Sequence, residues 1–474
     1  MQASSAASLP ADRHSREGCI AHAAAYLDQG GLLRDLSRRV AYQSESDAGK
    51  LPPALTAYLQ DEMAPYLTSM GFDCRILGNP VDGGGPFLVA RRIEDASQPT
   101  VLLYGHGDVV SATPSSWRAG LEPWRVVVEG ERWYGRGTAD NKGQHSISLG
   151  GLRSAIHARG GSLGYNVTVL LESGEEAGSP GLLEFCAKHR DLLRADLFIG
   201  CDGPRIRADR PTLFLGSRGM VNFTLSLSCR DRAFHSGNWG GVLRNPATVL
   251  ANAVSTMIDA RGVMRVEGLR APEISPDIRK AVSSLPIGGD ENDPVLDEGW
   301  GEPGLTPAER LIAWNTMEIL TFASGSIERP VNAIPPRAIV HCQLRFVVGT
   351  QWERLEEFIS AHLRRHGFQG IDVKVDMATA ATRLDLSSPW VQWCVDSLSA
   401  TTGEPIAVMP NLAGSIPNSA FSDVLGLPTL WIPHSYPACG QHGPNEHLLA
   451  PIARQGLEIM AGLYWDLGAP GAPW

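Results

Sequence analysis

Apolar residues recur along this chain with two different spacings, which predict helices and strands. Helical spacing runs through residues 17–40 and 55–70, and glycines at positions 30, 31 and 71 mark stops. Shorter apolar runs predict strands at residues 72–77, 86–91, 101–104, 166–171, 196–200 and 428–433, with further helices at 143–159 and 448–467. Helices followed by strands, and then strands alternating with helices, predict an α/β fold with a mixed sheet flanked by helices.

The middle of the chain has an alternation of its own. Residues 220–228 and 339–347 predict strands, and residues 246–259 and 353–366 predict helices. We therefore expect a smaller α/β domain at residues 217–380, inserted into a discontinuous larger domain formed by residues 1–216 and 381–474. A chain of 474 residues is long enough for two cores. Within the insert, residues 267–306 are rich in Gly, Pro and Asp and predict a long surface excursion.

Composition narrows the class of protein. A net charge of −10 and a pI near 5.7 argue against nucleic acid or an anionic membrane as the main partner. No apolar run has the length of a membrane span, and the Ala/Ser-rich start, residues 1–16, predicts a short flexible tail rather than a signal peptide. The eight cysteines are scattered without a CxxC pair, which is typical of reduced thiols. We expect a cytoplasmic protein.

Acidic and histidine residues follow several of the predicted strands or lie in glycine-rich turns. The candidates are His106, Asp108, Asp140, Glu175, Glu176, Asp202 and His442. Taken singly, each has an ordinary alternative: Asp140 could only cap the helix that follows it, and Glu175 and Glu176 could form a solvated acidic loop. Taken together, two imidazoles and three carboxylates suit two zinc-like ions better than calcium or magnesium. Manganese or cobalt would also accept these ligands.

Two adjacent glutamates allow a division of labour. Side chains of neighbouring residues point in different directions, so one of Glu175 and Glu176 can bind a metal while the other addresses the bound water. Metal-assisted hydrolysis requires both functions. One carboxylate must also be shared between the ions if both are to keep an open position.

The order of the motifs resembles one known family. HxD (His106, Asp108), GRGxxDxKG from Gly135, GEE from Gly174, CDG from Cys201, HSGxxGG from His235 and HxPNE from His442 are similar to those of the M20 family of dizinc peptidases and aminoacylases. Within that family the carnosinase-like dipeptidase branch is the most similar. The resemblance spans about residues 55–467.

This resemblance implies roles for the metal-site residues. Asp140 would bridge the two ions, with His106 and Asp202 completing one site and Glu176 and His442 completing the other. Glu175 would be the general base, and Asp108 would orient His106. The peptide bond between Asp140 and Asn141 would be cis.

The resemblance also implies that the inserted domain is a lid that forms a dimer interface. His235 would donate a hydrogen bond to the oxyanion, although a histidine hydrogen-bonded within its own turn is the alternative. His235 and Asn332 would reach the site from the other subunit. Arg345 would clamp a substrate carboxylate, although a surface ion pair is the common alternative for an arginine. Gly414 and Ser415 would also contact that carboxylate, in a turn where Ala413 replaces the glycine of many relatives. An ordinary tight turn is the alternative.

We therefore expect a metal-dependent hydrolase that cleaves an amide bond beside a free carboxylate, acting on small peptides as a dipeptidase or carboxypeptidase-type peptidase. An N-acyl or N-carbamoyl amino acid amidohydrolase on the same scaffold is the alternative. A non-catalytic binding protein is disfavoured, because the base and all five ligands are present. We expect a homodimer that binds neither nucleic acid nor membrane.

Overall fold

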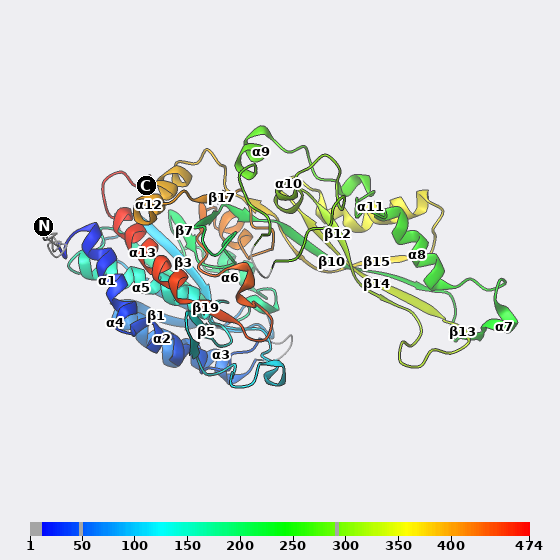
Figure 1. The fold of residues 1–474 in the computed structure, drawn as a ribbon, viewed down its shortest axis with the longest axis horizontal. Coiled ribbons are helices and arrows are strands. Elements are labelled where there is room, and N and C mark those ends of the chain that lie inside the picture. Colours follow the sequence, from blue (N-terminus) through cyan, green and yellow to red (C-terminus); the bar gives the residue numbers. More distant parts are fainter. Residues whose placement is uncertain (1–11, 47–50, 290–292) are drawn as a thin grey trace, which may run out of the picture.

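An eight-stranded mixed sheet is the framework of the larger of two lobes (Figure 1). The structure is a computed structural model that describes residues 12–46, 51–289 and 293–474. Across the sheet the strands are β1 (Asp73–Leu77), β2 (Phe87–Arg92), β6 (Asn166–Glu172), β3 (Thr100–His106), β7 (Leu197–Gly200), β18 (Thr429–Trp431), β8 (Thr212–Phe214) and β17 (Ala407–Met409). The central run β6, β3, β7 and β18 is parallel, and the pairs β1–β2 and β2–β6 are antiparallel. The predicted mixed sheet is confirmed.

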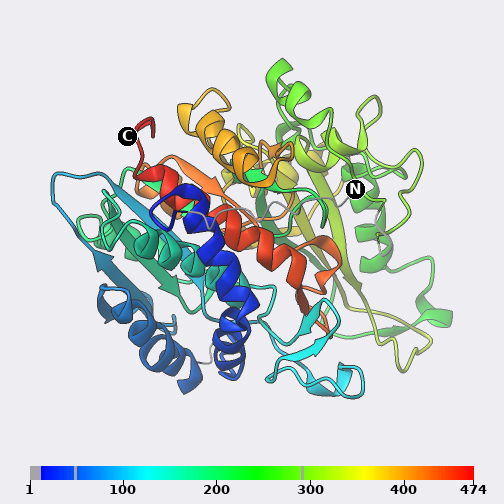
Figure 2. The same ribbon diagram turned by 60° about the vertical axis from the view of Figure 1, so that its left-hand side comes forward.

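Side chains alternate between the two faces of this sheet. In β3, Val101 and Leu103 join one core cluster, whereas Leu102 and Tyr104 join another. The first cluster is covered by α1 (Arg16–Asp28), α2 (Gly31–Val40), α5 (Lys142–Ala158), α12 (Pro389–Thr402) and α13 (Ala450–Leu467). In this layer α13 packs directly against α1 and α5 (Figure 2). Both faces of the sheet are thus buried, as parallel strands require.

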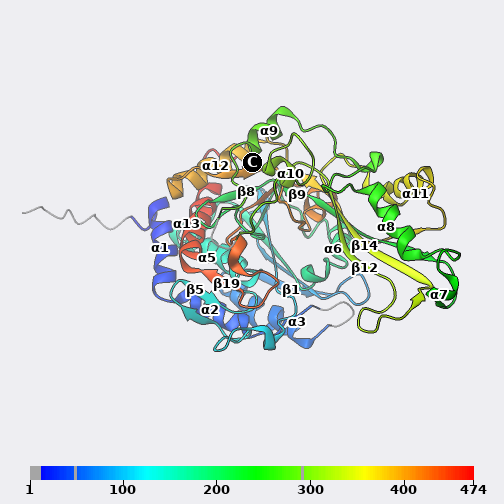
Figure 3. The same ribbon diagram turned by 45° about the vertical axis from the view of Figure 1, so that its right-hand side comes forward.

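The second face of the sheet is covered by shorter helices. These are α6 (Leu182–Lys188), α9 (Pro276–Val282) and α10 (Pro307–Ile312), and in Figure 3 they lie away from the layer that contains α1 and α13. The prediction that residues 267–306 form a long surface excursion is therefore wrong in part. Ile274, Ile278 and Val282 are almost completely buried in the core of the large lobe. Their spacing of four residues is helical, but it is hidden in a segment rich in Gly and Pro.

The smaller lobe is built on a four-stranded antiparallel sheet. Its order is β12 (Thr316–Ala323), β14 (Arg337–Phe346), β10 (Gly219–Ser228) and β15 (Asp372–Thr379). Helices α8 (Pro246–Met257) and α11 (Leu355–Arg365) pack on one face and share its core. Beyond the sheet, the short pair β11 (Phe234–His235) and β13 (Ala333–Ile334) and the helical turn α7 (Ser236–Trp239) form a protruding tip (Figure 1).

Two short strands mark where the chain passes between the lobes. β9 (Gly216–Ser217) leads out of the large lobe, β16 (Thr382–Arg383) leads back, and the two pair antiparallel. Other elements of the large lobe are α3 (Pro53–Ala57), a π-helical turn Tyr58–Met63 and α4 (Ala64–Ser69), and a small sheet of β4 (Val127–Glu129), β5 (Arg132–Tyr134) and β19 (His447–Leu449). No helix of the described ranges is long and apolar enough to cross a membrane. Most of the expected flexible tail, residues 1–11, lies outside the described residues.

Candidate metal centre

Three neighbouring parallel strands deliver side chains to one edge of the large sheet. β3 ends at His106, β6 leads into a 3-10 turn at Glu175–Ala177, and β7 is followed by Asp202. The strands β6, β3 and β7 lie side by side. The carboxyl ends of parallel strands meet at the same edge, which is where open α/β sheets form their sites. Residues far apart in the sequence are thereby brought together.

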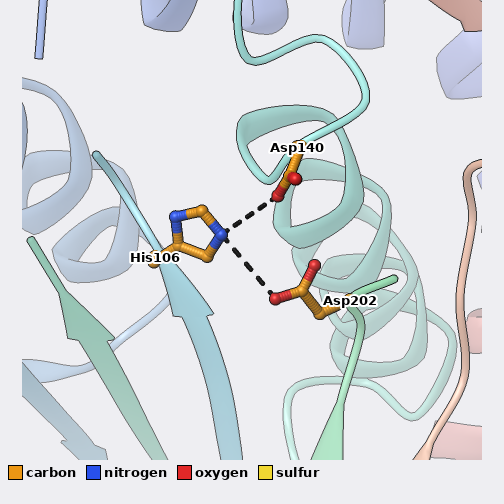
Figure 4. Close-up of side chains that lie close together, drawn as sticks. All are labelled: His106, Asp140 and Asp202. Atoms are coloured by element: carbon orange, nitrogen blue, oxygen red, sulfur yellow. Dashed lines mark hydrogen bonds and ion pairs between the residues drawn. The ribbon is translucent and has the colours of Figure 1, made fainter. Parts of the chain in front are cut away.

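The first donor group consists of His106, Asp140 and Asp202. His106 Nε2 lies 3.1 Å from Asp140 Oδ1 and 3.7 Å from Asp202 Oδ2. Figure 4 shows the imidazole facing both carboxylates, with Asp140 entering from the turn before α5. All three residues are buried. The peptide bond between Asp140 and Asn141 is cis, which confirms the prediction.

The second donor group consists of Asp140, Glu176 and His442. His442 Nε2 lies 3.2 Å from Asp140 Oδ2 and 3.1 Å from Glu176 Oε2. In each group the potential ligand atoms lie within 4.8 Å of one another. Asp140 belongs to both groups, and its two oxygens face different imidazoles. This is the arrangement of a carboxylate placed between two cations.

Glu175 and Asp108 lie beside the donor groups. Glu175 Oε2 is 3.9 Å from His106 Nε2, so this carboxylate faces the centre without belonging to either group. Asp108 is fully buried and lies behind His106, with Oδ1 3.4 Å from Nδ1. The Asp108 carboxylate also accepts hydrogen bonds from the backbone amides of Glu175 and Glu176. Asp108 therefore fixes both the histidine and the turn that carries the glutamates.

The charges at this edge are those of a site built for cations. Burial raises the pKa of Asp202 to about 6, with the nearby Asp140 carboxylate adding to the rise. Burial and the same neighbour raise the pKa of Glu176 to about 7, and burial raises the pKa of Glu175 well above its usual range. Hydrogen bonds to Asp140 and Glu176 raise the pKa of His442 to about 11. A bound cation would relieve this mutual repulsion, and imidazole with carboxylate suits zinc, manganese or cobalt.

Glu446 is a buried carboxylate for which no role was predicted. It forms an ion pair with Arg136, with Nη1 and Oε2 2.7 Å apart, and accepts a hydrogen bond from the backbone amide of Asp140. The signal that could have identified it is Arg136 itself. A glycine-flanked arginine in a turn before a buried helix needs an anionic partner, and Glu446 lies in a motif that also carries His442.

A cavity of about 750 Å³ lies between the two lobes beside the donor groups, and one part of it is lined by Asp140, Glu176, Asp202 and His442. Arg345, Gly414 and Ser415 also line it. The Arg345 guanidinium donates to Ser415 Oγ at 2.9 Å and to Gln343 Oε1 at 2.9 Å. Within the described ranges Arg345 makes no salt bridge, and these two hydrogen bonds are to neutral groups. The guanidinium is available to an anion in the cavity.

His235 and Asn332 lie together, but not with the donor groups. His235 is exposed in β11 at the protruding tip, and the Asn332 backbone carbonyl accepts a hydrogen bond from Ser236 N at 2.8 Å. Neither residue lines the cavity of its own chain. The structure thus separates these two predicted substrate contacts from the other three.

The fold and the paired donor groups define a two-lobed α/β protein with a candidate dinuclear metal centre at the edge of its larger sheet. The model of peptidase family M20/M25/M40 matches residues 102–466, and the chain belongs to this family. The predicted family is confirmed, and this protein is a metallopeptidase-type enzyme by that membership.

Known proteins are similar to this chain over most of its length. It is 33% identical over 410 residues to the Beta-Ala-His dipeptidase of Rattus norvegicus, covering 81% of this chain and 80% of the relative. It is 28% identical over 376 residues to the cysteinylglycine-S-conjugate dipeptidase of Corynebacterium striatum, covering 75% and 78%. The solved structure of the di-peptidase Dug1p from Saccharomyces cerevisiae has the same fold, with a TM-score of 0.79 at 20% identity over 97% of this chain and 100% of that one.

Proposed function

We propose that this protein is a zinc-dependent dipeptidase that cleaves the amide bond of small peptides beside their free carboxylate. The observation that carries the proposal is the sharing of Asp140 by two donor groups, with Glu175 facing the space beside them. The dipeptidases among the relatives of this chain support the choice of substrate class. The similarity to those relatives favours a dipeptidase over an N-acyl or N-carbamoyl amino acid amidohydrolase.

His106, Asp140 and Asp202 would hold one ion, and Asp140, Glu176 and His442 the other. Zinc fits these ligands, and manganese or cobalt would also be accepted. When bound, such ions polarise a carbonyl oxygen and lower the pKa of water.

Glu175 is the group we assign to proton transfer. Its carboxylate lies at the centre but outside both donor groups, so it can face a water at the metal site without being a ligand. In this role it takes the proton from the attacking water and passes it to the leaving nitrogen. Asp108 holds the Glu175 turn through the backbone amide hydrogen bond and so keeps the carboxylate in place.

Arg345, Gly414 and Ser415 form the proposed carboxylate subsite. Arg345 is already hydrogen-bonded to Ser415, so the guanidinium and the turn approach the substrate as one unit. A planar guanidinium can bind both oxygens of a carboxylate. This subsite would select substrates that end in a free carboxylate and would place the scissile bond over the donor groups.

We further propose a homodimer in which the partner subunit's His235 and the partner subunit's Asn332 complete the site. Both residues are exposed at the tip of the small lobe and absent from the cavity of their own chain. The proposed lid and dimerisation domain comprises residues 217–380, apart from the segment with α9 and α10, which packs on the large lobe, and the catalytic domain comprises residues 1–216 and 381–474. A cytoplasmic location is proposed because the eight cysteines, all within the described ranges, are unpaired thiols.

A substrate panel tests the proposed function. The purified protein is loaded with zinc and assayed with Cys-Gly, β-Ala-His and Leu-Gly against N-acetyl and N-carbamoyl derivatives of the same C-terminal residues. We expect higher kcat/KM for the dipeptides. A reversed preference would assign an amidohydrolase instead, and metal uptake without turnover of any substrate would indicate a binding protein.

A further inference from the structure

Glu446 makes more hydrogen bonds to the turn that carries Asp140 than its ion pair with Arg136 alone would give. Its carboxylate accepts four hydrogen bonds, and all four donors belong to residues 136–140. Arg136 Nη1 and Gly137 N donate to Oε2 at 2.7 and 3.0 Å, and Ala139 N and Asp140 N donate to Oε1 at 2.8 and 2.9 Å. Glu446 is fully buried and Arg136 almost fully buried, so water cannot substitute for these contacts.

The same two segments are joined by backbone contacts as well. Gly135 N donates to the Glu446 carbonyl oxygen at 3.0 Å, and Arg136 Nη2 donates to the Gly443 carbonyl oxygen at 2.9 Å. His442 lies in this second segment, four residues before Glu446. These six hydrogen bonds therefore join the turn that carries Asp140 to the loop that carries His442, and four of them end on the Glu446 carboxylate.

We infer that Glu446 is a positioning residue that sets the place of Asp140 relative to His442 and thereby the affinity of the dinuclear centre for metal. This inference rests on the proposed metal site. The physical reason is the direction of the donors. Three backbone amides and a guanidinium converge on one carboxylate, and the last of these amides belongs to Asp140 itself. A change that removes this acceptor leaves the Asp140 amide without its partner and loosens the hold on the shared carboxylate.

Glutamine is the informative replacement. Glu446→Gln keeps the length of the side chain, but its NH₂ group must face two of the four donors, and the buried Arg136 loses its counter-charge. Loss of residues that orient metal ligands typically weakens metal binding about 10- to 100-fold, and we expect a loss in this range. Glu446→Asp keeps the charge but is one methylene shorter, so we expect a smaller loss of affinity.

A second buried carboxylate supplies the matched control. Glu309 is also buried, pairs with Arg279 and accepts a backbone hydrogen bond from Thr306 N at 2.8 Å, but it lies in α10 outside both donor groups. Glu309→Gln should lower the melting temperature without changing metal affinity. A merely structural role for Glu446 would give the same result as this control.

The experiment measures zinc affinity and stoichiometry by competition with a chromogenic chelator, on metal-stripped full-length variants whose circular dichroism matches the wild type. A 10- to 100-fold loss in Glu446→Gln, with no change in Glu309→Gln, is expected. Affinity within twofold of wild type in a folded Glu446→Gln protein would overturn the inference. If that variant does not fold, Glu446→Asp is judged by the same comparison, and unchanged affinity in it overturns the inference. Because the readout is metal affinity, it stands whether or not dipeptides prove to be the substrates.

Discussion

His442 Nε2 and Glu176 Oε2 lie 3.1 Å apart, yet the two side chains differ greatly in exposure. The His442 side chain is 61% exposed and that of Glu176 is 4% exposed. His442 also lies in a loop with a φ of 59°, a conformation that few non-glycine residues adopt. In the first donor group no side chain is more than 9% exposed. The two donor groups therefore differ in how far solvent can reach their ligands.

This inequality predicts that the two metal ions leave at different rates. The ion held with His442 should be removed first by a chelator, because this ligand is open to solvent on a loop, whereas His106 is held at the end of a buried strand. Zinc release into a chromogenic chelator should show two phases of equal amplitude. His442→Ala should abolish the faster of these two release phases and leave a protein that binds one ion. A single phase that releases both ions would contradict the prediction.

Glu175→Gln should separate chemistry from metal binding. The variant keeps both donor groups but loses the proton acceptor, and general-base catalysis contributes about 10²- to 10⁴-fold, so kcat should fall by an amount near the upper end. KM should change little, because substrate binding rests on other groups. Steady-state kinetics in a zinc-replete assay measure both.

Glu176→Gln is the matched comparison. Glu176 belongs to the second donor group, so its loss should weaken one metal site, and activity should recover in part as zinc is added. If added zinc instead rescues Glu175→Gln, the two glutamates have exchanged roles. Near-normal turnover of Glu175→Gln would show that no protein base is needed.

The sequence could predict the features that nearby residues determine, but not those that depend on residues far apart in the chain. His106 and Asp202 lie at the carboxyl ends of buried strands. Because the carboxyl ends of parallel strands lie at the same edge of a sheet, the sequence pattern could predict that these two side chains lie close together. Glu446 was harder to predict: Arg136 signals the need for an anionic partner, but no local pattern shows that the partner lies some 300 residues later in the chain. Ile278 was missed for another reason: its helical spacing is short and lies among glycines and prolines, so composition outweighed pattern. The tip position of His235 depends on how the lobes are arranged, which no local pattern encodes.

Arg345→Ala should affect binding of acids far more than binding of their amides. A charge-assisted bidentate contact is worth about 1.5 to 3 kcal/mol, and only a substrate with a free carboxylate forms it. KM for a dipeptide should therefore rise strongly, and KM for the corresponding dipeptide amide should not. Arg345→Lys should be intermediate, since it keeps the charge but not the planar fork. Equal effects on acid and amide would assign Arg345 a different role.

Metal affinity should rise with pH. In the metal-free protein the pKa of Asp202 is raised to about 6, that of Glu176 to about 7 and that of His442 to about 11, so these ligands bind protons that a metal must displace. Lowering the pH through these values protonates more ligands and weakens binding. Between pH 6 and 8 we expect the logarithm of the zinc affinity to rise by about one to two per pH unit, the number of protons released.

Calorimetry checks this count directly. Titrations in buffers with different ionisation enthalpies give the number of protons released per zinc ion. His442→Ala should release about one proton fewer than the wild type at pH 8, because His442 is a ligand that is still protonated there. Affinity that is independent of pH, or that falls as the pH rises, would contradict the prediction.

The placement of His235 predicts complementation between two inactive subunits. His235→Ala and Glu175→Gln should each be nearly inactive as homodimers, the first because it lacks the oxyanion donor and the second because it lacks the base. In a mixed dimer, the His235→Ala chain still supplies Glu175 to its own site, and the Glu175→Gln chain supplies an intact His235 to that same site. One of the two sites is then complete, so about half of the wild-type activity should return, as expected for two equivalent sites in a twofold dimer. The two chains are co-expressed with different affinity tags, and the mixed dimer is isolated by purification on both. If His235 instead served the site of its own chain, each site of the mixed dimer would lack one group, and the mixed dimer would be as inactive as its parents.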